Sequence, residues 1–269
     1  MKKPLISVVM ATFNEPPEYI TQSIQSILNQ TLGDFELLLI DDSTNPDTMA
    51  TIDGLAQSDS RIKLIREKQR IGFVRALNVG LKQAQGIYIA RMDGDDISLP
   101  RRFELQVAYM ETHPDIAVVG GAMDIMNKKG EIVSHRNYAT TSFGIRLFAL
   151  MRNPLAHPSI MMRQQLVENG FCYDETFNKT EDMELWLRLM KKGYKISNIP
   201  NALILYRIID NIADKRIGDN FKYAYKARTK NFSWRYPLWS LTSLLIAKIY
   251  TLLPKKIVTT AYKIENKNV

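Results

Sequence analysis

The first part of the chain alternates short, continuously apolar runs with stretches of helical periodicity. Four apolar runs predict strands, at residues 5–10, 35–40, 62–65 and 87–90. Between them, apolar residues recur at helical spacing, in one stripe from Ile20 to Leu28 and in a second from Val74 to Ala84. Uninterrupted apolar strands joined by helices are typical of a parallel sheet covered on both faces. The pattern therefore predicts an open α/β fold.

Shorter elements follow between residues 116 and 207. Residues 116–121 (IAVVGG) and 157–163 (HPSIMMR) predict strands, and residues 123–133 (MDIMNKKGEIV) predict a hairpin. Residues 142–151 (SFGIRLFALM) predict a short helix. Two more short strands, YKISNI at residues 194–199 and ALILYR at residues 202–207, complete the globular part.

The segment TEDMELWLRLMKKG, residues 180–193, carries the signals of a well-defined helix. Thr180 stands where a residue caps the N-terminus, acids fill the first turn and lysines the last, and Gly193 stands at the C-terminus. This helix and the elements above are assigned to one globular domain, residues 1–212. Its nucleotide-binding part covers about residues 1–97 and its acceptor part about residues 98–212.

Residues 213–269 form a separate basic extension in this prediction. From Lys215 onward there are twelve Lys or Arg residues against two acids, so residues 215–269 have a net charge of +10. The whole chain has a net charge of +8, so residues 1–214 have a net charge of −2. A main domain without a basic face argues against nucleic acid as the partner. The apolar stretch at residues 238–253 contains Lys248 and is shorter than the roughly 20 residues that span a bilayer. Two interpretations remain, an interfacial helix on the membrane surface or a helix packed on the core.

The composition is that of a globular protein in a reducing compartment. A chain of 269 residues with 45% hydrophobic residues can bury a full core. The one cysteine, Cys172, cannot form an internal disulfide, and the apolar run near the start leads into Asn-Glu-Pro-Pro instead of a cleavage site. We expect a cytoplasmic protein, peripheral on the inner face of the cell membrane. The sequence does not indicate an oligomeric state.

Asp41 and Asp42 end the second predicted strand, where open parallel sheets bind their ligands. The following residues are rich in turn formers, so turn chemistry is an alternative reading. The loop after the first strand, ATFNEPPEY, has no glycine-rich phosphate cradle. An acid after strand two then suits a contact to a base or ribose, and a diphosphate would need a divalent cation.

Asp93, Asp95 and Asp96 follow the fourth predicted strand within four residues. Carboxylates this close repel one another and raise one another's pKa, which costs stability unless a cation lies among them. Ligands that offer only oxygen suit Mg²⁺ or Mn²⁺, whereas the twelve-residue spacing of an EF-hand calcium loop is absent. The alternative is helix capping by Asp95, Asp96 or Ser98 ahead of Pro100, which accounts for one acid.

Glu181 and Asp182 begin the helix at residues 180–193. Acids at this position stabilise the helix dipole, and this is sufficient reason for their presence. Close to a metal site, the same carboxylates would also be placed to accept a proton from a hydroxyl nucleophile.

Five segments, in this order, resemble the bacterial family 2 glycosyltransferases with the GT-A fold, and above all the branch that builds O-antigen and capsular polysaccharide. They are SVVMATFNE, FELLLIDDSTNPDT, GFVRALNVGLKQAQGIYIARMDGDD, NPLAHPSIMMR and TEDMELWLRL, and the likeness covers about residues 5–207. It implies a Rossmann-like, mostly parallel central sheet with helices on both faces. It also implies inverting transfer of a hexose from a UDP-sugar to a lipid-linked or saccharide acceptor, such as a sugar on undecaprenyl diphosphate.

The resemblance also implies roles for individual residues. For the nucleotide sugar, the matching positions are Thr12, Phe13, Glu15, Asp41, Asp42, Arg75, Asp93 and Gly94. Asp42 would hydrogen-bond the uracil. Asp95 corresponds to the residue that binds Mn²⁺ or Mg²⁺, with Asp93 as its partner on the ribose or metal side and Asp96 as support. Asp182 corresponds to the catalytic base, beside Glu181.

Other positions are open to two interpretations. His157 either faces a sugar or closes a strand, and Arg75, Arg91 and Arg207 either reach phosphate or sugar or pair with the acids. Many relatives have a histidine two residues after Tyr-Arg, where this chain has Ile209. Two rival functions use the same acids: a metal-dependent nucleotidyltransferase or phosphotransferase, and a non-catalytic protein that binds nucleotide sugars.

Overall fold

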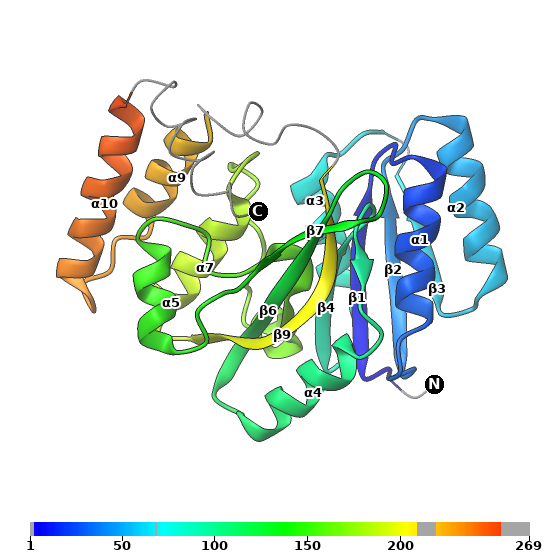
Figure 1. Cartoon of the computed structure of the whole chain (residues 1–269), viewed down its shortest axis with the longest axis horizontal. Coiled ribbons are helices and arrows are strands. Elements are labelled where there is room, and N and C mark those ends of the chain that lie inside the picture. The colour runs from blue at the N-terminus through cyan, green and yellow to red at the C-terminus, as the bar shows by residue number, and fades with distance from the viewer. Residues whose placement is uncertain (1–2, 68, 209–218, 254–269) are drawn as a thin grey trace.

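The computed structural model describes residues 3–67, 69–208 and 219–253 and confirms the α/β fold (Figure 1). One sheet has the strand order β3-β2-β1-β4-β8-β6-β9-β5, with β7 paired to β6. The first four predicted strands are β1 (Ile6–Thr12), β2 (Phe35–Asp41), β3 (Ile62–Arg66) and β4 (Tyr88–Asp93). They pair in parallel, because the segments that join them cross over as helices.

The other half of the sheet is mixed. Its strands are β5 (Ile97–Ser98), β6 (Ile116–Met126), β7 (Ile132–Arg136), β8 (Met161–Arg163) and β9 (Lys195–Arg207). Since β8 is antiparallel to both β4 and β6, those two run the same way, and β9 is parallel to β6. The sheet is thus mostly parallel, with the shorter β5, β7 and β8 reversed.

Helices cover both faces of the sheet (Figure 1). One core lies under α1 (Pro17–Leu28), α2 (Pro46–Ser58) and α4 (Arg102–Thr112). The second lies under α3 (Phe73–Gln83), α5 (Ser142–Ala149), the short α6 (Gln164–Glu168) and α7 (Glu181–Lys191). Strand β1 shows why both faces need cover: Val8 and Met10 enter the first core, and Val9 and Ala11 enter the second.

Several sequence predictions are corrected. The two short strands expected at residues 194–207 are one strand, β9, whose register against β6 shifts between Gly121 and Met123. The segment HPSIMMR is a strand only in its last three residues, because His157–Ser159 form a 3₁₀ turn, η1. Helix capping by Asp95, Asp96 or Ser98 is wrong, since β5 follows the acids and α4 begins only at Arg102.

Thr180 does precede the helix, but it does not cap it through its side chain. Its backbone is left-handed, with φ at 59°, and its Oγ1 is buried without a hydrogen-bond partner among the described residues. A β-branched residue in this conformation is strained by about 1–2 kcal/mol. The strained residue immediately precedes Glu181 and Asp182.

The extension contains the two helices α9 (Asp219–Lys230) and α10 (Pro237–Leu252). Helix α10 matches the predicted apolar stretch at residues 238–253. Among the described residues, no helix has the length and apolar character to cross a membrane. A small third core joins the extension to the domain, with Phe177, Met183 and Leu187 packed against Ala227 of α9.

Candidate active site

The candidate residues lie at the edge of the sheet where the parallel strands end. Strands β1, β2, β4 and β9 run in one direction and end at Thr12, Asp41, Asp93 and Arg207. Parallel strands bring residues that are far apart in the sequence to the same edge. The edge therefore gathers both the predicted nucleotide-binding residues and the acids.

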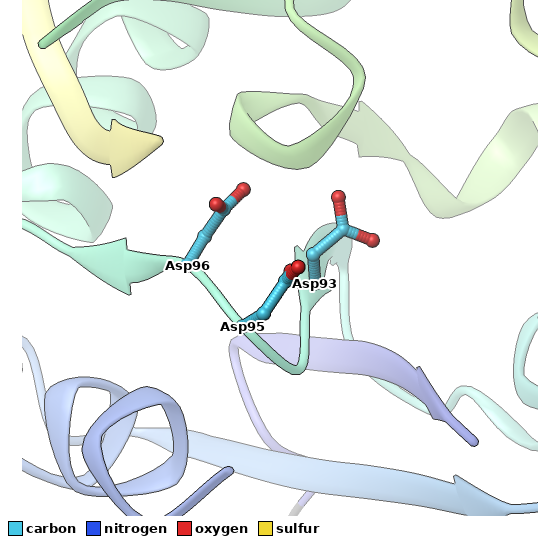
Figure 2. Close-up of side chains that lie close together, drawn as sticks. All are labelled: Asp93, Asp95 and Asp96. Carbon is cyan, nitrogen blue, oxygen red and sulfur yellow. The ribbon is translucent and has the colours of Figure 1, made fainter. Parts of the chain in front are cut away.

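Asp93, Asp95 and Asp96 form an acidic turn between β4 and β5 (Figure 2). One carboxylate oxygen of each lies within 4.8 Å of the others. Asp96 is 1% exposed, and its Oδ2 is buried without a hydrogen-bond partner among the described residues. Burial, and next the charge of Asp93, raises the pKa of Asp95 to about 6 and that of Asp96 well above its ordinary value. An unpartnered buried oxygen among destabilised carboxylates fits a site for a hard divalent cation.

Two arginines contact the acidic turn. Arg91, 4% exposed, donates from both terminal nitrogens to the two carboxylate oxygens of Asp93. The backbone N–H of Arg207 donates to Asp96 Oδ1 over 2.8 Å, and its Nε donates to the carbonyl of Asp95 over 2.9 Å. Arg91 and Arg207 thus pair with the acids, one of the two roles expected of them.

Glu15 adds a fourth carboxylate beside the turn. A Cβ added at Gly94 would lie 3.2 Å from the carboxyl carbon of Glu15, so glycine allows this close approach. Burial raises the pKa of Glu15 to about 7, and the charges of Asp95 and Asp93 contribute. Its Oε2 accepts from the N–H of Phe13, which places it at the predicted nucleotide loop.

The two acids after β2 have different environments. Asp41 is fully buried, and its carboxylate accepts from Thr12 Oγ1, the N–H of Ser43 and Arg66 Nε. This arrangement matches the turn-chemistry alternative. Asp42 accepts from the N–H groups of Ile71 and Gly72 at 2.9 and 2.8 Å.

Asp42 therefore fixes the loop before α3 against the end of β2. That loop carries Arg70, whose guanidinium lies over the ring of Phe13 at 3.8 Å from its centroid. Phe13 is 37% exposed, and its position at the end of β1 leaves a ring at the surface of the predicted nucleotide pocket. Arg75 lies elsewhere: it is exposed on α3 and pairs with Glu175 over 2.9 Å.

A cavity of about 530 Å³ joins the acidic turn to the start of α7. Asp93 and Arg91 line it from β4, and Glu181 and Asp182 line it from the helix. Residues of η1, including His157, form another part of the wall. Asp93, a predicted metal partner, and Asp182, the predicted base, are 89 residues apart in the chain and line the same cavity.

The carboxylate of Asp182 is held from two sides. Its Oδ1 accepts from the N–H of Met183 over 2.7 Å, and its Oδ2 accepts from Asn153 Nδ2. Asn153 follows α5 and also lines the cavity. Its contact to Asp182 was not predicted, although it begins the segment NPLAHPSIMMR. Donors on both oxygens fix the direction of the carboxylate.

Glu181 is the neighbouring acid with a different environment. Burial, and next the charge of Asp182, raises its pKa to about 7. Two adjacent carboxyl groups with different surroundings, one buried and the other hydrogen-bonded on both oxygens, can take separate roles as acid and base. Near neutral pH Glu181 takes up a proton, and Asp182 is the acid with the better hydrogen-bonded carboxylate.

His157 lines the cavity and does not close a strand. It is 8% exposed, and its Nε2 lies 2.7 Å from the hydroxyl of Tyr173. Burial and the nearby charge of Arg91 lower the pKa of His157 well below its ordinary value, so the ring is neutral. Tyr173 was not predicted, because nothing in its local sequence marks it. Ile209 lies outside the described residues.

The profile described as Glycosyl transferase family 2 matches residues 7–174, from β1 past the acidic turn and His157. This chain belongs to glycosyltransferase family 2. It is an enzyme of the transferase class, as the resemblance found in the sequence implied. The matched residues end before Asp182, which lies in α7.

Two curated relatives of the transferase carry names from polysaccharide synthesis. The O-antigen biosynthesis glycosyltransferase WbnJ of Escherichia coli is 34% identical over 217 residues, 78% of this chain and 82% of that protein. The amylovoran biosynthesis glycosyltransferase AmsE of Erwinia amylovora is 31% identical over 218 residues, 81% of each.

Two solved structures share the fold at lower identity. Staphylococcus aureus TarS 1-349 in complex with UDP-GlcNAc has a TM-score of 0.70 at 19% identity, and the match covers 89% of this chain and 70% of that one. The mannosyltransferase PcManGT of Pyrobaculum calidifontis, in complex with GDP-Man and Mn²⁺, has a TM-score of 0.71 at 14% identity. That match covers 98% of this chain and 76% of the other.

Proposed function

We propose that this transferase moves a hexose from a UDP-sugar, with inversion, to a sugar on a lipid diphosphate in the synthesis of a surface polysaccharide. The observation that carries the proposal is the shared cavity, which Asp93 and Asp182 line from opposite parts of the fold. A donor with its diphosphate at the acidic turn would direct its sugar toward the helix that bears the base. The names of TarS and PcManGT, solved with nucleotide sugars, support a donor of this kind.

Asp182 is the proposed general base. Its carboxylate would take the proton of the acceptor hydroxyl while that oxygen bonds to the anomeric carbon and the bond from this carbon to UDP breaks. UDP leaves with the electron pair. A single displacement of this kind inverts the anomeric centre, and it needs one base and no carboxylate nucleophile.

The donor side is proposed at residues 1–97. In this proposal Asp42, Phe13 and Glu15 would lie beside the nucleotide, and Asp95 and Asp96 would hold Mn²⁺ or Mg²⁺. The bound ion supplies neutralisation of the diphosphate charge as UDP departs. Arg91 donates to both oxygens of Asp93, whereas Asp96 Oδ2 has no hydrogen-bond partner among the described residues.

The acceptor side is proposed at residues 98–212, with Glu181 and His157 near the acceptor or the donor sugar. The names of WbnJ and AmsE support a role in polysaccharide assembly. An acceptor on undecaprenyl diphosphate implies work at the cytoplasmic face of the cell membrane, with α9 and α10 of the extension nearest the lipid.

The test is a UDP-release assay over a panel of UDP-sugars, with a synthetic lipid-diphosphate acceptor, with and without EDTA. We expect release with one donor, its loss in EDTA, and a fall of at least about a hundredfold in kcat for Asp182→Asn. Asp95→Asn should raise the Mn²⁺ concentration needed. Asp115→Asn, which changes an exposed acid paired with Lys195, is the matched control. Full turnover by Asp182→Asn would refute the base, and release of pyrophosphate would indicate nucleotidyl transfer.

A further inference from the structure

Helix α10 exposes its large apolar side chains and buries its small ones. Five apolar residues on it are between 47% and 79% exposed: Leu238, Leu241, Leu245, Ile249 and Leu252. At about 100° per residue they fall within an arc of roughly 80°. Ser240, Ser243 and Ala247 on the other side are buried, and Ser243 accepts from Arg228 of α9 over 2.8 Å. A helix that only packs on a core has the reverse arrangement.

A second apolar stripe lies on the neighbouring helix. Phe143, Leu147 and Met151, spaced by four residues along α5 and the turn after it, are 71%, 56% and 56% exposed. The two helices contact one another, since Trp239 of α10 donates to the carbonyl of Arg146 over 2.7 Å. We call these two stripes together the α5/α10 surface.

The α5/α10 surface adjoins the active-site cavity at Met151. Met151 belongs to the exposed stripe and also lines the cavity. Tyr250 of α10 lines the cavity as well, but from the side of the helix that bears Ser243 and Ala247, and it stacks on Phe221 with ring centroids 5.3 Å apart. An object that covers the surface would therefore lie beside Met151, at the wall of the cavity that Asp182 also lines.

The charge on the helices of the α5/α10 surface and on the neighbouring α9 is mostly positive. Residues 142–152 contain two arginines and no Asp or Glu, and residues 219–253 contain six Lys or Arg against the single acid Asp219. Lys222 and Lys248 are exposed on α9 and α10. A second copy docked on this surface would bring like charges together, which disfavours a homodimer. An apolar stripe with basic flanks is complementary to an anionic lipid surface.

We propose that the α5/α10 surface binds an anionic phospholipid bilayer, with the leucines of α10 among the acyl chains near the headgroups. Trp234, 84% exposed just before the helix, is placed for the headgroup region. The proposal rests on the proposed function only for the acceptor, because a protein bound in this way would hold its cavity close to a sugar carried on a lipid diphosphate. Lipid binding itself needs neither donor nor turnover.

The test is cosedimentation of the full chain with vesicles, with no donor or acceptor present. One set of vesicles is phosphatidylcholine alone and the other contains phosphatidylcholine and phosphatidylglycerol in equal amounts. We expect binding to the anionic set, weaker binding at high salt, and a loss of at least about tenfold in affinity for Leu241→Gln with Leu245→Gln. Ile87→Gln is the matched control, because Ile87 is 58% exposed and Leu241 is 56% exposed.

A second variant, Lys222→Glu with Lys248→Glu, should weaken binding to the anionic vesicles alone. Circular dichroism and urea unfolding of each variant would confirm that the exposed substitutions leave the fold intact. Equal binding to both vesicle sets, or undiminished binding by the leucine variant, would overturn the proposal. The proposal would also be overturned if the protein did not bind vesicles and instead formed a dimer that the leucine substitutions dissociate. UDP release measured separately with a soluble acceptor keeps a failure of lipid binding distinct from a failure of the transfer reaction.

Discussion

Replacing Glu181 with glutamine should stabilise the protein at pH 8 and change its stability little at pH 5. Burial, with the charge of Asp182 as the next cause, raises the pKa of Glu181 from an ordinary 4.5 to about 7. A group whose pKa is higher in the folded state contributes stability that is fully present below its unfolded pKa. That contribution is lost as the pH rises through the folded pKa. The wild type should thus lose stability between pH 4.5 and about 7, and Glu181→Gln should not.

The size of the effect follows from the same pKa. The difference between 4.5 and about 7 corresponds to about 3 kcal/mol if the carboxylate is fully shielded from water. Glu181 lines a cavity and is only partly buried, so solvent screens part of its charge. We expect Glu181→Gln to be more stable than the wild type by about 1–2 kcal/mol at pH 8.

Urea unfolding of the full chain, followed by circular dichroism at pH 5 and pH 8 in EDTA, measures this difference. Contributions of the other acids cancel between variant and wild type if they lie outside contact with residue 181. Glu104→Gln is the control of opposite sign, since its hydrogen bonds to Arg101 and Thr31 lower the pKa of Glu104. If Glu181→Gln changed the free energy of unfolding equally at both pH values, Glu181 would not have the raised pKa on which this prediction rests.

Three further results are expected. Asn153→Ala should lower kcat more than it raises KM, by about tenfold, because Asp182 loses a charge-assisted hydrogen bond; Asn153→Ser should recover part of the loss in the same assay. Thr180→Asn should raise the free energy of unfolding in urea by about 1 kcal/mol, since asparagine tolerates the left-handed backbone; no gain would mean that residue 180 is unstrained. Asp96→Asn should raise the Tm in EDTA by about 2–4 °C and abolish the increase that Mn²⁺ gives the wild type; a retained Mn²⁺ increase would place the cation elsewhere.

The fold was largely predictable because its signals are local. Continuous apolar runs located β1 to β4, and the hairpin at residues 123–133 is confirmed by the β6–β7 pair. Helix α2 was missed, since it buries only Thr48 and Ile52 and contains Gly54. Its start signal was present, because Asn45 ahead of Pro46 accepts from the N–H groups of Asp47 and Thr48. A cap signal was therefore more informative here than the apolar stripe.

The site was predictable where strand ends determine it and not where tertiary contacts do. The position after a parallel strand was enough to place Asp42 and the acidic turn at one edge. The same rule selected Asp41, which the structure buries against Arg66. Asn153 and Tyr173 lie in loops, and their contacts to Asp182 and His157 depend on packing between elements that the sequence does not bring together.

The charge balance of the acidic turn is a further property that only the structure supplies. From the sequence alone, the three aspartates were expected to repel one another equally. The family resemblance implied that Asp95 binds the metal with Asp93 as its partner. In the folded chain Arg91 binds both carboxylate oxygens of Asp93, while Asp96 keeps one buried oxygen without a partner among the described residues. Since an unpaired buried carboxylate oxygen is costly, it is the position that gains most from a cation. We therefore propose Asp96, in place of Asp93, as the second ligand beside Asp95, while Asp93 holds Arg91 at the wall of the cavity that Asp182 also lines.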